Sequence, residues 1–437
     1  MKSNYKKIGD FIELVDVRNK DLSIDLLLGL SVTKEFISSV ANTIGTNMKN
    51  YKIIRKGQFA CSVMQVRRDK KMPVALLQDF DEAIISQAYP VFQIKDETQL
   101  IPEYLMMWFT RSEFDREACF HAVGGVRGSL EWEDFLNMEL PVPSIEKQQE
   151  IVKEYNTVVK HIKLNEQINE KLEETAQALY KHWFVDFNFP ITKESCPELV
   201  SGSPELEGKP YKSSGGEMVY NEELDGEIPL GWGVSLIYNF IEDTLGGDWG
   251  KDKPIGNYIK KVRCVRGTDI PLLKRGNLIK APIRYILEKN LKNREILKDQ
   301  IVIEISGGSP TQSTGRSVLV TENHLKFLNE KIICSNFCRT LKLKNVLYSK
   351  FLFSHIDYLY SIDYLFSFEN STTGVKNFNI NSFLEEEYLI VPSEQTLKLF
   401  NSHFDIIITH QILNQKEICE LEKINNLLLS KMTKIGV

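Results

Sequence analysis

The chain has 437 residues, which is enough for two to four domains, and 42% hydrophobic with 26% charged residues is the composition of a globular protein. Its longest apolar runs, such as residues 26–30, are too short for a transmembrane helix, and the charged first ten residues lack the apolar segment of a secretory signal. The net charge of −5 argues by itself against a nucleic-acid partner, but this charge is unevenly distributed along the chain.

The chain contains seven cysteines, an odd number, and they are scattered. The closest pair, Cys334 and Cys338, has no second pair at the spacing of a zinc site. With no secretory signal expected, reduced thiols in a cytosol are the favoured interpretation. We therefore expect neither disulfides nor a metal site.

Residues 1–143 predict a first lobe of mixed strands and helices. Short apolar or alternating runs bounded by Gly, Pro or Asp predict strands at residues 58–66, 74–77, 83–86 and 91–94. Residues 102–120 predict one helix, because apolar residues recur along one face and Pro102 stands near its start. A glycine-rich turn follows at residues 124–128.

Residues 144–187 predict a long helix whose apolar residues recur at spacings of four and three, as in the seam of a coiled coil. The same pattern returns 249 residues later, in 392–437, with no insertion or deletion. One such stripe fits an ordinary core-facing helix equally well, but two stripes in phase favour two paired spacer helices of about 60 Å each. The predicted seam residues are Ile151, Tyr155, Val158, Ile162, Asn165, Asn169, Leu172 and Trp183 in the first helix, and Phe400, Phe404, Asn414, Leu421 and Leu428 in the second.

Several seam positions carry amides, among them Asn165 and Asn169 in the first helix and Asn414 in the second. Buried amides cost stability but penalise slipped registers, so we expect them to fix how the helices align and hence the spacing between the lobes. The seam alone does not distinguish parallel from antiparallel helices. An antiparallel register would place Asn169 near Asn414.

Residues 188–231 are rich in Pro, Gly, Ser and acidic residues and predict an exposed linker. Residues 232–391 then repeat the first lobe in outline: Gly125-Val126-Arg127 matches Gly374-Val375-Lys376, and Pro143-Ser144 matches Pro392-Ser393. The predicted fold is α+β, with two similar mixed α/β lobes separated by two long helices and an internal pseudo-two-fold repeat.

Basic residues gather in both lobes. Residues 49–71 hold eight Lys or Arg against one Asp, and residues 251–300 hold fourteen against five acidic residues. The helix at 144–186 is acidic, with eight Asp or Glu against six Lys. Each basic run could be a solvated face, but the two together suit a pair of anion-binding heads.

Motifs for catalysis are missing. The sequence has no Gly-x-Gly-x-x-Gly, no His-Glu-x-x-His and no Pro-Pro-Tyr motif of the amino-methyltransferases. Residues 309–317 superficially resemble a phosphate loop, but Pro310 stands where the first glycine belongs and Arg316 replaces the lysine. We therefore expect a binding protein without catalytic residues and without a cofactor of its own.

Two loops are candidates for nucleic-acid contact. Residues 306–316 are small, polar and glycine-rich, so their amides and hydroxyls could bind phosphates, while Gln312 and Arg316 suit adenine and guanine edges. Residues 64–71 occupy the comparable place in the first lobe, and both loops could also be plain hairpin turns. The candidate DNA-binding residues are Gln65, Arg67, Arg68, Lys70, Lys71 and Arg127 in the first lobe, and Ser309, Gln312, Arg316 and Lys376 in the second.

Five stretches together resemble the specificity subunits of type I restriction–modification systems. The most diagnostic are LPVPSIEKQQEIV (140–152) and QALYKHWFVDF (177–187). The others are EIPLGW (227–232), SGGSPTQSTGR (306–316) and VMQVRRDKKMPVAL (63–76). The resemblance extends over essentially the whole chain.

This resemblance implies that each lobe is a target recognition domain for one half of a split double-stranded DNA sequence. The two helices would pack antiparallel and fix the number of unread base pairs. The chain would assemble, in a bacterial or archaeal cytoplasm and away from membranes, with two adenine-N6 methyltransferase subunits and with restriction/translocase subunits. S-adenosylmethionine, Mg and ATP would belong to those partners.

Three other functions stay open at this point. The chain could be the recognition subunit of a two-subunit type II restriction–modification enzyme, which has the same lobes. It could be a coiled-coil scaffold whose lobes bind proteins. It could also be an enzyme with an unrecognised site.

Overall fold

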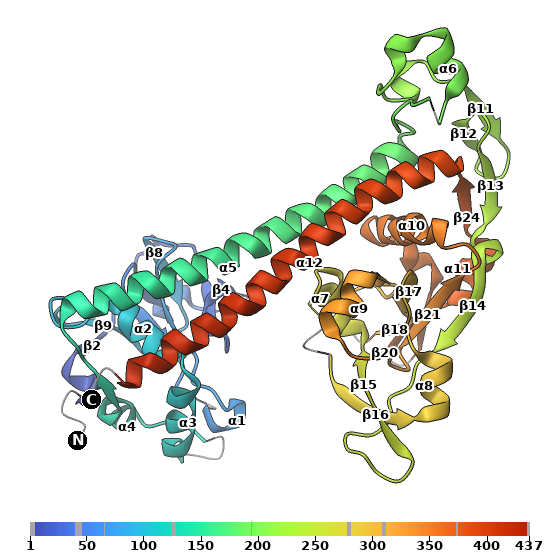
Figure 1. The fold of residues 1–437 in the computed structure, drawn as a ribbon. Coiled ribbons are helices and arrows are strands. Elements are labelled where there is room, and N and C mark those ends of the chain that lie inside the picture. The colour runs from blue at the N-terminus through green and yellow to red at the C-terminus, as the bar shows by residue number, and fades with distance from the viewer. Residues whose placement is uncertain are drawn as a thin grey trace. The chain divides into compact units, whose positions relative to one another are not determined.

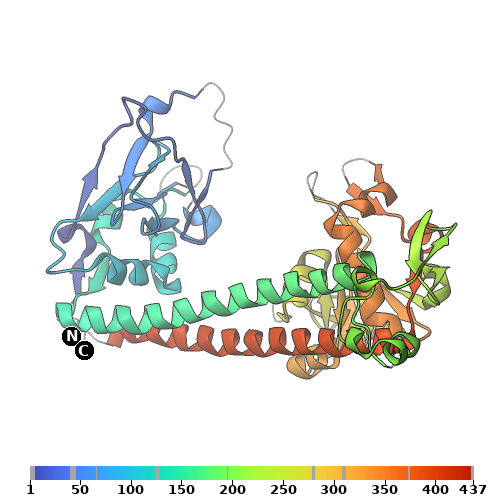
Figure 2. The same ribbon diagram turned by 90° about the horizontal axis from the view of Figure 1, so that it is seen from above.

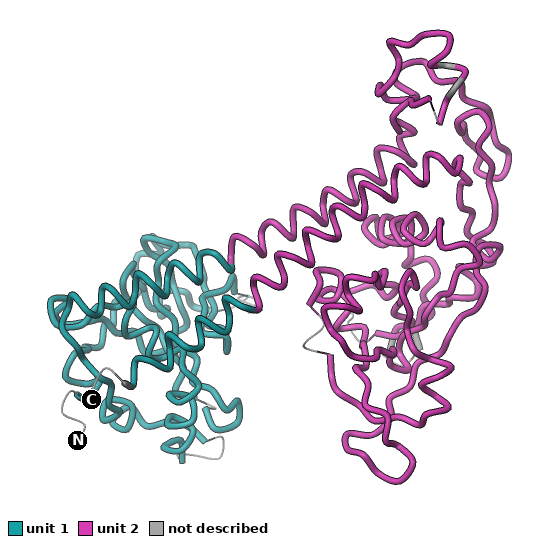
Figure 3. The backbone as a smooth tube through the Cα atoms, in the orientation of Figure 1, with its two compact units in different colours: residues 1–162, 420–437 teal, residues 163–419 magenta. Residues whose placement is uncertain are grey.

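The structure is a computed structural model that describes residues 5–39, 46–64, 66–123, 128–193, 195–277, 281–307, 312–372 and 375–434. It forms two compact units, one of residues 1–162 with 420–437 and one of residues 163–419 (Figure 3). This division differs from the predicted sequence of lobes, helices and linker. Each unit contains one lobe together with a part of both long helices, because each lobe packs on the helix segments next to it.

The first unit is built on a four-stranded antiparallel sheet in the order β2-β9-β6-β7. Phe59 and Phe92 stack on one another across this sheet, with ring centroids 5.0 Å apart, and Phe109 and Phe135 cover them. The strands are β1 (Tyr5–Lys7), β2 (Ile12–Val15), β3 (Leu28–Leu30), β4 (Phe36–Ser38), β5 (Lys52–Arg55), β6 (Phe59–Cys61), β7 (Val74–Leu76), β8 (Glu82–Ile85), β9 (Val91–Ile94) and β10 (Glu139–Pro141), and the helices α1 (Val66–Asp69), α2 (Pro102–Thr110), α3 (Ser112–His121) and α4 (Trp132–Asn137).

The prediction of a single helix over residues 102–120 is wrong. Arg111 is extended (φ −71°, ψ 141°) and separates α2 from α3. Its guanidinium lies 4.2 Å from the centre of the Trp108 ring, and the break turns Phe114 towards Phe109, with ring centroids 4.9 Å apart. The strand predicted at 58–66 is also shorter than expected, since β6 ends at Cys61 and Val66 begins α1.

The second unit repeats this topology. Its main sheet has the order β14-β21-β17-β19, in which the strands occupy the places of β2, β9, β6 and β7. In both units a strand near the start of the lobe pairs with the strand that precedes a long helix: β1 with β10, and β13 with β24. The predicted internal repeat and the α+β class are therefore confirmed.

The second unit contains further strands and helices besides this shared topology. Its strands are β11 (Met218–Asn221), β12 (Gly226–Pro229), β13 (Gly233–Leu236), β14 (Ile241–Gly246), β15 (Tyr258–Val265), β16 (Ile283–Leu287), β17 (Gln300–Glu304), β18 (Ser306–Gly307), β19 (Ser317–Val320), β20 (Ile332–Cys334), β21 (Cys338–Leu343), β22 (Glu369–Thr372), β23 (Val375–Phe378) and β24 (Tyr388–Val391). Its helices are α6 (Pro197–Gly202), α7 (Ile270–Lys274), α8 (Glu288–Arg294), α9 (Glu322–Leu328), α10 (Ser349–Ser361) and α11 (Ile380–Glu386).

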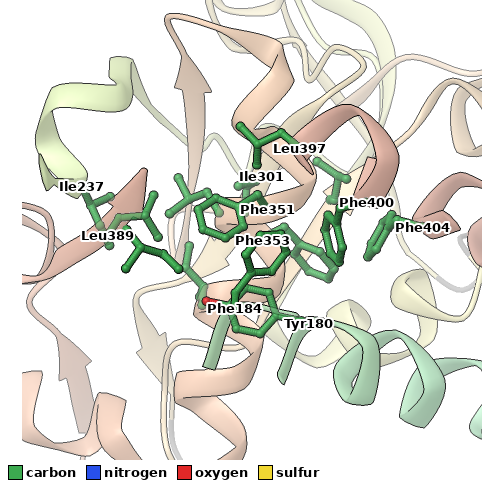
Figure 4. Close-up of a cluster of buried hydrophobic side chains, with 14 of the residues drawn as sticks. Tyr180, Phe184, Ile237, Ile301, Phe351, Phe353, Leu389, Leu397, Phe400 and Phe404 are labelled. Carbon is green, nitrogen blue, oxygen red and sulfur yellow. The ribbon is translucent and has the colours of Figure 1, made fainter. Parts of the chain in front are cut away.

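The aromatic core of this unit joins the lobe to the long helices. Figure 4 shows Tyr180 and Phe184, at the end of the first long helix, meeting Phe351 of α10 and Phe400 of the second long helix. The rings of Phe184 and Phe351 lie 4.6 Å apart and those of Phe184 and Phe400 lie 5.0 Å apart. Helix and lobe therefore share one hydrophobic core.

Residues 188–231 are folded, contrary to the expected exposed linker. Pro, Gly and Ser form turns around α6 and the β11–β12 hairpin. Phe189 is buried between Tyr211 and Trp232, with both ring pairs stacked at 4.7 Å. Composition predicted the turns, but these three aromatic residues are too far apart in sequence for their stacking to be predicted.

The two long helices, α5 (Ile145–Tyr180) and α12 (Glu394–Lys431), lie side by side within each unit (Figures 1 and 2). In the first unit Ile151 shares a core with Leu429. In the second unit the Asn169 side-chain oxygen accepts a hydrogen bond from the Asn414 amide at 3.1 Å, and Asn165 donates to Glu417 at 3.0 Å. Partner numbers fall along α12 as they rise along α5, so the helices are antiparallel, and Asn169 meets Asn414 as that register predicts.

The remaining seam residues are buried or half-buried. Burial raises the pKa of Tyr155 overall, because it outweighs the opposite effect of side-chain hydrogen bonds with Asn425 and Thr110. The helix α12 also buries Leu397, Ile408 and Ile412, which lie outside the predicted seam, because it packs on the lobe as well as on α5. The other predicted seam positions that are shielded from solvent are Val158, Ile162, Leu172, Trp183, Phe404, Leu421 and Leu428.

The seven cysteines, all in the described part of the chain, are free thiols. No helix of the described ranges is both long enough and apolar enough to cross a bilayer.

Replacing Asn169 by Leu should lower the free energy of unfolding by about 1–3 kcal/mol, because the Asn414 amide loses its partner within the helix pair. Replacing both residues by Leu should recover most of this loss, since no amide is then left unpaired. Chemical denaturation of the full chain measures both effects. The control is Asn426→Leu, at an exposed position of α12, which should change stability by less than about 0.5 kcal/mol.

Candidate nucleic-acid interface

In the first unit the candidate residues lie on and after α1. Val66 is buried and anchors this short helix, while Arg67, Arg68, Lys70 and Lys71 are all exposed. Arg68 forms an ion pair with the adjacent Asp69 at 2.7 Å, so its charge is partly neutralised. The structure thus presents a cluster of basic side chains to solvent from one fixed turn.

The turn is held by its backbone. The Arg67 N–H donates to the carbonyl of Gly128 at 3.1 Å. Gly128 has φ +68°, and a Cβ there would lie 2.4 Å from the Arg67 Cβ, so only glycine permits this approach. Two of the candidates, Gln65 and Arg127, lie outside the described residues.

In the second unit the Gln312 side chain is exposed, but the Arg316 side chain is already paired with Glu304. The Arg316 guanidinium donates twice to the Glu304 carboxylate, at 2.8 and 2.6 Å, and the two side chains are only 15% and 4% exposed. These hydrogen bonds raise the pKa of Arg316 despite its burial. Gly267 makes room for the carboxylate, because a Cβ there would lie 2.0 Å from Glu304 Oε1. Arg316 therefore serves first as the partner of Glu304.

Lys376 supports the backbone of the same loop. Its ammonium donates to the Gln312 carbonyl at 3.3 Å and lies 3.6 Å from Glu369 Oε2. Glu369 in turn accepts a hydrogen bond from the Thr314 hydroxyl at 2.8 Å. Lys376 and Glu369 thus fix the backbone from which Gln312 projects. Ser309 lies outside the described residues.

Residues of four separate segments meet Gln312 and Arg316 around a cavity of about 870 Å³. The lining residues outside the predicted loop 306–316, such as Trp249, Arg266 and Phe337, were not candidates from the sequence, because no periodicity or motif connects segments so far apart. The only local signals are the aromatic residues in otherwise polar turns, and Phe337 stays 61% exposed. The described lining residues are Trp249, Arg266, Gly267, Thr268, Glu304, Ser306, Gly307, Gln312, Ser313, Thr314, Arg316, Ser335, Asn336 and Phe337.

The charges around this cavity are largely balanced. Arg266 is paired with Asp269 at 2.8 Å, as Arg316 is with Glu304. What remains available is a set of hydroxyls, amides and aromatic faces, which suits hydrogen bonding and stacking with uncharged planar groups. Within the described ranges no three His, Cys, Asp or Glu residues are grouped so as to hold a metal ion.

Comparison with known proteins gives a consistent result. Residues 3–174 match the family model described as the type I restriction modification DNA specificity domain. The type I restriction enzyme MjaIX specificity subunit of Methanocaldococcus jannaschii is 26% identical over 351 residues, which cover 76% of this chain and 68% of that protein. The type I restriction enzyme HindI specificity subunit of Haemophilus influenzae is 22% identical and covers 87% of this chain and 86% of its own.

The chain is therefore similar to type I restriction–modification specificity subunits, through the family model in residues 3–174 and through the two relatives over most of its length. The fold agrees with this similarity. The crystal structure of the type I restriction–modification S subunit from M. genitalium aligns over 98% of this chain and 95% of its own, with a TM-score of 0.51 and 12% identity.

Replacing Arg316 by Met should destabilise the protein by about 3–5 kcal/mol, because Glu304 is then left buried without its cation. Glu304→Gln together with Arg316→Met should recover most of the stability. Gln312→Ala should change it by less than about 0.5 kcal/mol, since that side chain is exposed. Denaturant unfolding of the three variants checks this order, and a fully stable single Arg316 variant would contradict it.

Proposed function

We propose that this chain recognises a split DNA sequence, one half with each lobe, and thereby directs the methyltransferase and restriction subunits of a type I system to their target. The observation that carries the proposal is the repeated sheet, with its loops carrying basic or hydrogen-bonding residues in both units. The similarity of residues 3–174 to the DNA specificity domain and the two related specificity subunits support the same function.

In the first lobe we assign phosphate contacts to Arg67, Lys70 and Lys71. They are exposed cations on one anchored turn, and neutralising phosphates releases counterions from the duplex. Such contacts supply affinity without base choice. Arg68 contributes less, because it shares its charge with Asp69.

In the second lobe we assign base recognition to Gln312. Its amide can donate to and accept from one adenine edge, a contact worth about 1–3 kcal/mol of discrimination. Lys376 holds its backbone, and the Arg316–Glu304 pair supports the wall beside it. Arg316 therefore affects base choice mainly by supporting the cavity wall beside Gln312.

The chain itself would carry no catalytic residue. We propose two adenine-N6 methyltransferase subunits as partners, with S-adenosylmethionine bound to them, and restriction/translocase subunits that use ATP and Mg. The two relatives are specificity subunits of type I restriction enzymes, which supports such an assembly. A bacterial or archaeal cytoplasm is the compartment in which this assembly would meet DNA.

Mapping methylated adenines in the host genome tests the proposal as a whole. The expected result is one split motif with a fixed gap, and this motif should disappear when the gene for the chain is deleted. Methylation that persists without the chain would reject the proposal.

Changing Arg67, Lys70 and Lys71 together to Ala should weaken binding to all DNA sequences and reduce the slope of log K against log salt by about 2–3. Gln312→Ala should instead relax base choice in one half-site and leave the salt slope unchanged. Binding titrations at several salt concentrations, with base substitutions in each half-site, distinguish the two. Uniform weakening by Gln312→Ala would make it a phosphate contact.

Removing one heptad from each long helix, residues 159–165 and 416–422, should shorten the spacer by about 10 Å. Seven residues are close to two full turns, so the faces of both helices keep their orientation within about 20°. At about 3.4 Å per base pair the preferred gap should shrink by about three base pairs. Selection from a duplex library with variable gaps measures it, and an unchanged gap would reject the spacer hypothesis.

A further inference from the structure

A cluster of charged side chains inside the second unit joins its lobe to α5. Lys274, the last residue of α7, lies 2.8 Å from Glu173 Oε1 on α5 and 2.6 Å from Asp357 Oδ1 on α10. Gln177 of α5 donates to the other oxygen of Asp357 at 2.9 Å. The Lys274 and Asp357 side chains are only 14% and 10% exposed. Two elements of the lobe and one long helix thus converge on a single ammonium group.

The end of α7 contacts the second long helix as well. Gly276 has φ +87°, and a Cβ there would lie 3.3 Å from atoms of Ile412 and Gln415 on α12. Between them, Arg275 pairs with Glu173 at 3.2 Å and with Glu170 at 3.3 Å. One turn of the lobe is therefore placed against both α5 and α12.

The surroundings of Lys274 and Glu173 favour their charged forms. Burial lowers the pKa of Lys274, but the attraction of Asp357 and Glu173 outweighs it and raises the pKa overall. Burial likewise raises the pKa of Glu173, and Lys274 and Arg275 outweigh it and lower the pKa overall. The attraction between charges at these distances weakens strongly when the side chains move apart.

The apolar contacts around the cluster are less sensitive to the exact position of the side chains. Phe353 of the lobe packs against Phe404 of α12, with ring centroids 6.0 Å apart, as part of a continuous hydrophobic core. Burial of apolar surface is non-directional, so this core alone would tolerate a small shift of the lobe along the helices. A shift of one helical turn, about 5.4 Å, would separate Lys274 from Glu173.

We propose that Lys274, Glu173 and Asp357 are positioning residues that fix the second lobe on the long helices, and so determine how strictly one gap length is recognised. The inference rests on the proposed function. Buried ion pairs contribute little net stability compared with apolar residues of the same size, which favours a role in position over a role in stability. In the described part of the chain the ion pairs of the cluster join α5, α7 and α10 and involve no candidate DNA-binding residue, so its effect falls on the gap and not on base choice.

The test uses the triple variant Glu173→Gln, Lys274→Met and Asp357→Asn, which removes the charges and keeps the side-chain shapes. The full chain is purified with the methyltransferase subunits that it carries. Binding is measured on duplexes that contain the half-sites selected by the native protein, with the gap varied by one and two base pairs. Preference for the best gap over its neighbours should fall about 5- to 10-fold, while base discrimination and the melting temperature stay near native values.

Two further variants serve as controls. Lys171→Met with Glu174→Gln removes an exposed ion pair from the same helix and should leave the gap preference unchanged. Lys274→Arg keeps the positive charge and should retain most of the native preference.

The outcomes are distinct. A triple variant with native gap preference overturns the inference. So does a variant that loses gap preference and base discrimination together with a lower melting temperature, because the cluster would then be merely structural. A native protein that prefers no split sequence at all overturns the proposed function itself.

Discussion

Antiparallel pairing of α5 with α12 is the constraint on which the rest of the structure depends. Each lobe leads into a long helix through a strand of a two-stranded sheet, β10 before α5 and β24 before α12. Because the helices run in opposite directions, the segment of α12 that packs with the first lobe is its end, whereas the segment next to the second lobe is its beginning. Each unit can therefore be complete only when it contains parts of both helices.

The amides in the helix pair and the charges beside it act in the same way. The Asn169 amide donates to the backbone carbonyl of Gln411, the Gln411 amide donates to the backbone carbonyl of Asn169, and the Asn169 side-chain oxygen accepts from Asn414. None of these contacts survives a slipped register. In the first lobe the buried amide of Gln148 has a comparable role, since it donates to the carbonyls of Gln99 and Pro143 and accepts from the N–H of Ile101. Apolar burial stabilises the packing of the elements, and directional polar contacts determine their register.

The periodic pattern of the sequence predicted the long helices and the internal repeat. The offset of 249 residues identified both helices and the internal repeat, because duplication preserves spacing along a helix. The break at Arg111 and the folded segment 188–231 were not predictable in this way, since each depends on a contact between residues that no pattern connects. The candidate loops were located, yet the pairing of Arg316 with Glu304 follows only from the sheet that brings β17 and β19 together.

This pairing changes how base choice in the second lobe is understood. A guanidinium that is bound twice by a buried carboxylate keeps few donors for a base, and leaving that carboxylate would cost more than one base contact returns. An exposed amide such as that of Gln312 pays no comparable desolvation cost. Under the proposed function, specificity in this lobe would reside in exposed neutral side chains at the rim of the cavity, supported from behind by paired charges. The exposed cations of the first lobe, Arg67, Lys70 and Lys71, would supply affinity. Two lobes with one topology can differ in this way because the sheet is retained and only the loops change.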